Sequence, residues 1–243
     1  KIRDTKFKEE MYLYVENWEA AEKFSLKVFN SFKDLYDRMK GDIVFGFDVK
    51  EETRAIIKGQ SSSFAEYFKD EFIIDKDNLE RQIVKNISSK LTRVVQIEKK
   101  RGNLPEGDLV KNIEGSIRSA LYMHCRDLMN FNGSRYFLTK QKSIANYYFI
   151  REFCYGGMFR YNKDGHFNIP YGGIAYNKKD FRGKVDYIFS NDIRGLFKNT
   201  IIEKRDFLDL FNKYEFTDKD FIFLDPPYDT DFSSYEGNDF TTQ

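Results

Sequence analysis

Apolar residues follow helical spacing over most of the first two thirds of the chain. Residues 1–110 carry several such stretches among many charged positions, and the clearest runs from 79 to 97. Two more amphipathic patterns cover about 108–130 and 143–153. Side chains three and four positions apart share one face of a helix, so each pattern predicts a helix that buries its apolar face.

The helix predicted over 79–97 is followed by three cations, Lys99-Lys100-Arg101, and then by Gly102. Cations at the carboxyl end of a helix interact favourably with its dipole, and glycine is common just after the last turn. This structural explanation accounts for the three cations without a ligand. Contact with nucleic-acid phosphates is the alternative.

A different pattern appears near the end of the chain, where Phe221–Leu224 are four consecutive apolar residues between charged ones. Such a run predicts a buried strand of a parallel sheet. Two prolines follow Asp225, and the strand must end there because proline has no backbone N–H and restricts the residue before it. Thr200–Glu203 predicts a second strand. Helices and strands together predict an α/β fold.

The composition mainly excludes kinds of site and of location. The 243 residues include 40 basic and 39 acidic ones, so any nucleic-acid surface must be local. The two cysteines are far apart and the histidines number only two, so we expect neither a disulfide framework nor a metal site. No apolar run reaches the length of a membrane span and no signal peptide is recognisable, which predicts a cytoplasmic protein without a membrane partner.

The sequence Asp225-Pro226-Pro227-Tyr228 puts a carboxylate, free carbonyls and an aromatic ring at the carboxyl edge of the predicted strand, where open α/β folds bind ligands. A strand-ending turn with a solvated aspartate is the plainer explanation. The four residues resemble, however, the catalytic motif of amino-methyltransferases acting on DNA bases, in the form found in adenine N6 enzymes. The chemistry that this resemblance implies is physically reasonable, because a carboxylate and a proline carbonyl can accept both N–H groups of an amine attached to a base and localise its lone pair. The resemblance implies catalytic roles for Asp225, Pro226, Pro227 and Tyr228.

Residues 158–172 predict a β-hairpin, because Asp164-Gly165 is a strong signal for a tight hairpin turn. Basic, aromatic and amide side chains surround this turn. A two-stranded ribbon with such a tip can enter the major groove of DNA, although an ordinary hairpin has the same turn signal.

This second segment resembles the DNA-binding hairpin of Dam-type (D12 class) adenine methyltransferases, whose pattern is approximately Gly-x-x-Arg-Tyr-Asn-x-x-Gly-x-Phe-Asn-x-Pro-x-Gly. The matching residues are Gly157, Arg160, Tyr161, Asn162, Gly165, Phe167, Asn168, Pro170 and Gly172. Both motifs occur in the order found in that family. The residues that the resemblance implies in DNA binding are Arg160, Tyr161, Asn162, Lys163, Asp164 and Asn168.

Within this set, Tyr161 and Asn162 would lie beside the extruded adenine, and Lys163 and Asp164 stand where family members read bases. Asp164 suits a cytosine amine and would repel a phosphate. Three cations before the hairpin are expected to add positive charge suited to phosphates, namely Arg135, Lys140 and Lys142.

The resemblance also implies S-adenosylmethionine as the cofactor. Asp206 would accept a hydrogen bond from the cofactor's adenine amine, and Phe207 would pack on its ring. An aspartate that caps a helix, followed by an ordinary core phenylalanine, is the plainer explanation. The glycine-rich cofactor loop of the family is not found in residues 1–243, which leaves open whether this portion alone binds the cofactor.

We therefore expect an incomplete Rossmann-like class I methyltransferase core over residues 186–243, joined to a helical target-recognition region over 111–185 that ends in the hairpin. Residues 1–110 form a helical region of unknown role, for which an insertion is one explanation. The resemblance covers about 110–243, and the chain looks like an internal portion of a methyltransferase.

The function implied is methyl transfer from S-adenosylmethionine to N6 of an adenine flipped out of duplex DNA, at a GATC-like site. The setting implied is a restriction-modification system, in which a cognate restriction endonuclease is a candidate partner. Two alternatives remain open at this point: cytosine N4 methylation, and a DNA-binding module with a vestigial methyltransferase site.

Overall fold

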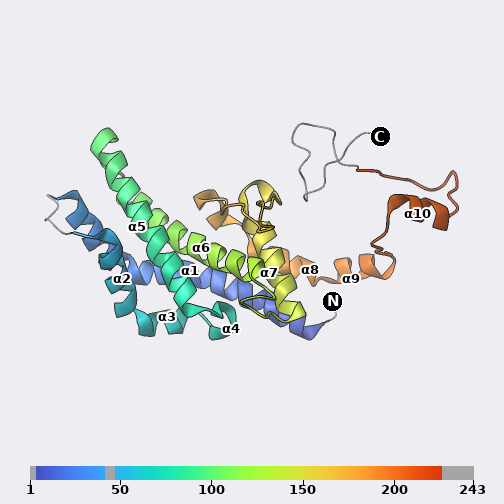
Figure 1. Cartoon of the computed structure of the whole chain (residues 1–243), viewed down its shortest axis with the longest axis horizontal. Helices are drawn as coiled ribbons and strands as arrows, with labels where there is room; N and C mark the ends of the chain where they lie inside the picture. Colours follow the sequence, from blue (N-terminus) through green and yellow to red (C-terminus); the bar gives the residue numbers. More distant parts are fainter. Residues whose placement is uncertain (1–3, 42–46, 226–243) are drawn as a thin grey trace. The chain divides into compact units, whose positions relative to one another are not determined.

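The computed structural model describes residues 4–41 and 47–225. The chain divides into two compact units, Lys1–Asp186 and Tyr187–Gln243, here called unit 1 and unit 2. Their helices are labelled in Figure 1. The helices of unit 1 are α1 (Thr5–Lys40), α2 (Val49–Gly59), α3 (Ser61–Tyr67), α4 (Asp70–Ile73), α5 (Lys76–Arg101), α6 (Glu106–Asn130) and α7 (Lys140–Phe153).

After α7, unit 1 continues through two short 3₁₀ helices, η1 (Tyr155–Gly157) and η2 (Ile174–Lys178), and reaches α8 (Phe181–Ile188) near its end. The helices of unit 2 are α9 (Asn191–Lys198) and α10 (Phe207–Lys213). No helix in the described part of the chain is long and apolar enough to cross a membrane.

Local sequence signals set the ends of the long helices. The Asp4 side chain accepts from Phe7 N (3.2 Å) at the start of α1, and the Asp75 side chain accepts from Asn78 N (2.8 Å) at the start of α5. Gly102 ends α5 with φ 90°, a conformation that favours glycine. The helices predicted over 79–97, 108–130 and 143–153 are confirmed as α5, α6 and α7.

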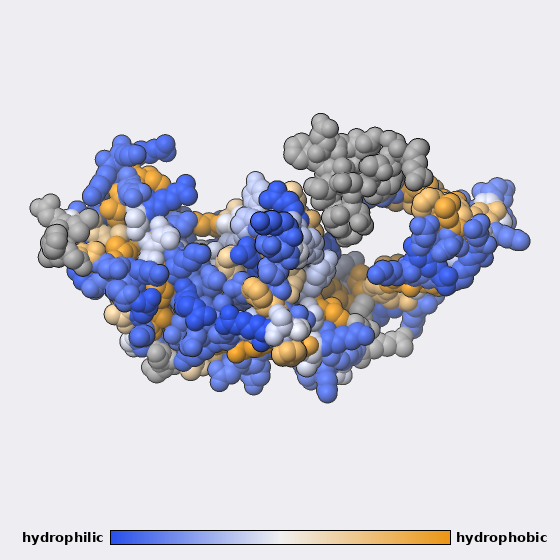
Figure 2. All heavy atoms as spheres, viewed as in Figure 1, coloured by the Kyte–Doolittle hydropathy of each residue, from blue (hydrophilic) through white to orange (hydrophobic). Residues whose placement is uncertain are grey.

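Aromatic side chains build much of the core of unit 1, where α1 packs against α6 and α7. Trp18 of α1 lies 4.0 Å from Phe153 of α7 between ring centroids, and Tyr14 meets Phe149 at 5.5 Å. The surface in the view of Figure 2 is mostly hydrophilic over unit 1, as expected when the apolar faces turn inward. Burial of these large rings supplies much of the driving force for folding.

A polar seam joins α5 to α6. Asp127 of α6 accepts hydrogen bonds from Asn78 (3.0 Å) and Gln82 (3.2 Å), and Ser119 donates to Asn86 (2.9 Å). His124, also buried here, pairs its Nδ1 with Asn78 Oδ1 at 2.9 Å. Burial lowers the pKa of His124 to about 4, so this histidine is a neutral core residue at pH 7.

The predicted α/β fold is wrong for this structure. The described residues contain no named strand and no sheet, only three isolated bridges. Thr200–Glu203 has no regular structure, and in Phe221–Leu224 every side chain is exposed, Phe221 to 91%. An extended segment becomes a strand only when a neighbouring segment satisfies its backbone N–H and C=O groups, and the described residues provide no such neighbour for these two.

Candidate functional site

The predicted β-hairpin over 158–172 is replaced by an irregular loop around one tight turn. A single bridge joins Tyr161 and Phe167. Within it, Asn162 N donates to His166 O (2.8 Å) and Gly165 N donates to Asn162 O (2.9 Å). Gly165 has φ 74°, which explains why glycine stands there. We call residues 158–172 the recognition loop; its turn forms, but its strands do not.

Asn162 closes this turn with its side chain. Its Oδ1 accepts from the backbone N of Asp164 (3.0 Å) and of His166 (2.9 Å), whereas its Nδ2 lies 3.5 Å from Asp164 Oδ2. Asparagine side chains that bond to a backbone group two residues on are typical of tight turns. The amide oxygen of Asn162 is therefore engaged in holding the turn, and its amide nitrogen has only the long contact with Asp164.

Two side chains of α6 anchor the base of the recognition loop. Asn130 holds the backbone of Phe167 through both amide atoms: Phe167 N donates to Oδ1 (2.8 Å) and Nδ2 donates to Phe167 O (3.0 Å). The Tyr122 hydroxyl donates to Ile169 O at 2.9 Å and is buried. Phe167 itself is buried, with the Phe159 ring 5.0 Å away. The base of this loop is therefore held against α6, and its tip is exposed.

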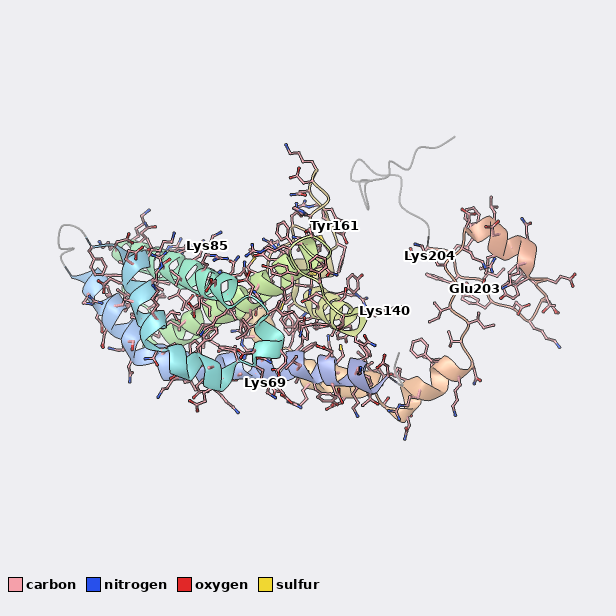
Figure 3. The ribbon with its side chains drawn as sticks, turned by 60° about the horizontal axis from the view of Figure 1, so that its bottom comes forward. Lys69, Lys85, Lys140, Tyr161, Glu203 and Lys204 are labelled. Atoms are coloured by element: carbon pink, nitrogen blue, oxygen red, sulfur yellow. The ribbon has the colours of Figure 1, made fainter. Side chains whose placement is uncertain are left out.

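All six residues predicted to bind DNA lie in this loop and are exposed: Arg160, Tyr161, Asn162, Lys163, Asp164 and Asn168. Figure 3 labels Tyr161, and 43% of this residue is exposed. The structure therefore brings the set together on one projection.

Two exposed apolar residues before the turn are not among the residues predicted to bind DNA. Tyr155 is 57% exposed and Met158 is 43% exposed, on either side of Gly156 and Gly157, which both have positive φ. The signal in the sequence was a large apolar residue on each side of a glycine pair. Exposed aromatic and apolar side chains beside a basic turn suit contact with base faces.

The positive charge expected before the loop is smaller than the sequence implied. Lys142 is buried, lies 3.4 Å from Glu10 and donates to the Glu71 carbonyl. Arg135 pairs with Asp75 at 2.7 Å. Lys140 is exposed (Figure 3). The side chain of Lys142 thus stabilises the packing of unit 1 and is not accessible to phosphates.

In unit 2, Asp206 and Phe207 lie at the start of α10. Asp206 Oδ1 accepts from Leu208 N at 2.9 Å, so this residue is the N-cap of α10, as the plainer explanation held. Its Oδ2 makes no hydrogen bond to any described residue. Phe207 is 59% exposed rather than a core residue. An available carboxylate oxygen next to an exposed ring fits what an adenine ring and its amine would need.

Asp225 ends the described part of the chain and is exposed. Pro226, Pro227 and Tyr228 lie outside the described residues. Among the residues that the structure describes, no three His, Cys, Asp or Glu side chains gather as metal ligands.

Comparison with known proteins identifies the family to which the chain belongs. The D12 class N6 adenine-specific DNA methyltransferase family matches residues 78–243, which include both the recognition loop and Asp225–Tyr228. This chain belongs to that family.

Three curated relatives illustrate the range of similarity. The type II methyltransferase M.CviBI of Paramecium bursaria Chlorella virus NC1A is 38% identical over 92 residues, 37% of this chain and 32% of the relative. The type II methyltransferase M.MjaIII of Methanocaldococcus jannaschii is 33% identical over 128 residues, 51% of this chain and 41% of the relative. The DNA adenine methylase of Haemophilus influenzae is 27% identical over 179 residues, 67% of this chain and 55% of the relative.

The chain thus spans from about a third to about half of the length of these relatives. No solved structure matches it.

Proposed function

We propose that this chain carries the DNA-recognition segment and the catalytic motif of a methyltransferase that modifies N6 of adenine in duplex DNA, with S-adenosylmethionine as the methyl donor. The observation that carries the proposal is the family match over 78–243, because it includes the recognition loop and the Asp-Pro-Pro-Tyr motif together.

Asp225 and Pro226 would prepare the adenine amine. This amine is a poor nucleophile because its lone pair is delocalised into the ring. The Asp225 carboxylate and the Pro226 carbonyl would accept its two N–H groups, draw the nitrogen towards tetrahedral geometry and localise the lone pair. Pro227 would keep the turn rigid, and Tyr228 would stack on the base after it leaves the duplex, as base-modifying enzymes require. The amine gains the methyl group and loses one proton.

Asp206 and Phe207 would hold the adenine ring of the cofactor. When bound, S-adenosylmethionine supplies an electrophilic methyl group on a sulfonium centre. Asp206 Oδ2 would accept from the amine on its adenine while Oδ1 continues to cap α10 through Leu208 N. The exposed Phe207 ring would cover one face of the adenine.

The recognition loop would bind the duplex through its exposed tip. Arg160 and Lys163 supply charge for phosphates or guanine, Asp164 can accept from a cytosine amine, and Asn168 is an exposed amide. Tyr161 offers a ring beside the target base. By resemblance the target is a GATC-like site. Two relatives are named type II methyltransferases, which supports a role in a restriction-modification system. In such a system the protein would act in the cytoplasm, and a cognate endonuclease would be its partner.

The test is to incubate the full-length protein with tritiated S-adenosylmethionine and unmethylated plasmid DNA, and then to digest the DNA to nucleosides. Label in N6-methyladenine is the expected result, and mapping then gives the site. Label in N4-methylcytosine would move the protein to the cytosine class. Binding of DNA without any label would leave a recognition module with a vestigial site.

A further inference from the structure

Helix α5 presents a basic face that the recognition loop does not account for. Lys85, Ser89, Arg93, Gln96 and Lys100 fall at successive steps of four, four, three and four residues, which places them on one side of a helix, and all five are exposed. Neither Lys85, Arg93 nor Lys100 makes an ion pair within the described part of the chain. We call this the α5 face.

From Arg81 to its end, the charged side chains of α5 are almost all positive. Its part from Arg81 to Arg101 contains seven cations: Arg81, Lys85, Lys90, Arg93, Lys99, Lys100 and Arg101. The single carboxylate in the same stretch, Glu98, is buried and already engaged, 3.2 Å from Lys40 and 2.6 Å from Leu104 N. Burial and the nearby Arg93 lower the pKa of Lys90, as expected where like charges sit together. The helix dipole explains cations in the last turn only, whereas Lys85 and Arg93 lie well before it.

A groove connects the α5 face with the recognition loop. It measures about 330 Å³ and is lined by Lys85, Asn86 and Lys90 of α5, by Ser119 of α6, by Pro170 of the loop and by Gly173 just after it. The views of Figures 1 and 3 agree that α5 and the loop lie on the same side of unit 1, and Figure 3 shows Lys85 and Tyr161 there, opposite Lys69.

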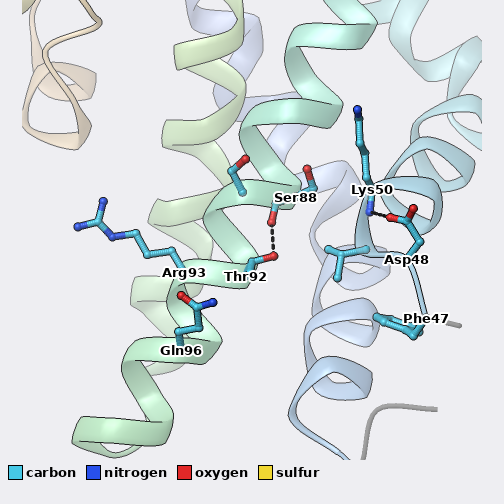
Figure 4. Close-up of a pocket in the computed structure, with 9 residues that line it drawn as sticks. Phe47, Asp48, Lys50, Ser88, Thr92, Arg93 and Gln96 are labelled. Atoms are coloured by element: carbon cyan, nitrogen blue, oxygen red, sulfur yellow. Dashed lines mark hydrogen bonds between the residues drawn. The ribbon is translucent and has the colours of Figure 1, made fainter. Parts of the chain in front are cut away.

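On its other flank, the α5 face borders a wide hollow of about 940 Å³ between α5 and the start of α2. Ser89, Arg93 and Gln96 line its α5 side, and in Figure 4 the side chains of Arg93 and Gln96 extend from α5 on the side away from Asp48 and Phe47. Asp48 stands on the opposite wall, where its carboxylate accepts from Lys50 N at 2.8 Å to cap α2. The exposed residues of the α5 wall, Ser89, Arg93 and Gln96, supply a hydroxyl, a cation and an amide, which are side-chain groups that contact nucleic-acid phosphates.

We propose that the α5 face binds the phosphate backbone of the DNA that flanks the target site, as a second contact beside the recognition loop. This inference rests on the proposed function. From Lys85 to Lys100 the helix rises about 22 Å, the length of about six base pairs, so the face matches a flank rather than the site itself. The groove that joins the face to the loop favours DNA over an acidic protein, because one duplex can reach both.

The test compares two charge-matched triple variants of the full-length protein. Lys85→Gln/Arg93→Gln/Lys100→Gln removes the α5 face, and Lys6→Gln/Lys23→Gln/Lys27→Gln removes three exposed cations from α1. Binding is measured by fluorescence anisotropy on a duplex of about 10 base pairs and on one of about 30 base pairs, both centred on the mapped site, over a salt series. Circular dichroism melting checks that both variants fold.

For the α5 variant we expect at least tenfold weaker binding to the long duplex, a salt slope lower by about 2 to 3, and unchanged binding to the short duplex. The α1 variant should behave like wild type on both. Equal behaviour of the two variants would overturn the inference. Polyglutamate, which stands for an acidic protein, is tested as a competitor: if the α5 variant lost affinity for polyglutamate but not for DNA, the inference would also be overturned. If wild type binds neither duplex, it is the proposed function that fails.

Discussion

The side chain of Asn162 closes the recognition loop on the backbone of His166, with Oδ1 accepting from N at 2.9 Å. The same oxygen accepts from Asp164 N at 3.0 Å, so one amide group sets the shape of the exposed tip. Asn162 thus holds the turn with its oxygen, and the contact with DNA that the resemblance predicts for the same residue would fall to its nitrogen.

Replacing Asn162 tests both roles. Asn162→Ala removes the two hydrogen bonds of the amide oxygen, of about 1 kcal/mol each, and the long one of the amide nitrogen, so site-specific binding should weaken by about tenfold or more while nonspecific binding changes little. Asn162→Asp keeps both acceptor bonds but has no amide N–H. It should restore hydrogen-exchange protection of the His166 amide without restoring specific affinity. The measurement is the dissociation constant on duplexes with and without the site. An equal loss of affinity for both duplexes in Asn162→Ala would refute the recognition role.

Asp225→Ala should remove methyl transfer. Without its carboxylate the adenine amine keeps a delocalised lone pair, and we expect kcat to fall by at least about a thousandfold. Duplex binding should stay within about twofold of wild type, because the recognition loop is untouched. The control is Asp218→Ala, which removes an exposed carboxylate from the same segment. Parallel loss of binding and transfer in Asp225→Ala would make Asp225 a structural residue.

Asp206 can be tested without losing its helix cap. Serine caps helices about as well as aspartate, so Asp206→Ser keeps the bond to Leu208 N but removes the oxygen proposed for the cofactor. Cofactor affinity, measured by isothermal titration calorimetry, should fall by about tenfold to a hundredfold, because a hydrogen bond to a charged group contributes about 1.5–3 kcal/mol. The melting temperature should not change. Wild-type affinity in Asp206→Ser would exclude this contact.

His124 should make the fold sensitive to acid. Its pKa is lowered from 6.5 to about 4 by burial, so the unfolded chain binds a proton more readily than the folded one. Its contribution to the free energy of unfolding is complete above pH 6.5 and is lost as the pH falls towards about 4, in total roughly 3 kcal/mol.

Urea unfolding at a series of pH values measures this. The stability of His124→Gln should fall less steeply than that of wild type between pH 6.5 and about 4. Parallel curves for wild type and His124→Gln would show that His124 is not the group responsible.

Local patterns were sufficient for the helices and for the family. The ends of α5 at Asp75 and Gly102 follow from a capping side chain and a glycine, because helix hydrogen bonds join residues four apart. The D12 family was likewise recognised from two short motifs, and the family match confirms it. The roles of the individual site residues, and the domain boundaries at 110 and 185, stay predictions.

The tertiary structure decided what depends on distant partners. A strand needs a neighbour to satisfy its backbone, so an apolar run such as Phe221–Leu224 could not by itself establish a sheet, and the predicted α/β fold was wrong. Only packing showed that Lys142 is buried between α1 and α4, that Asn130 holds Phe167, and that Lys85 and Lys90 of α5 line a groove beside the loop. Charge and spacing can be read from the sequence, but burial and pairing arise from residues far apart in it.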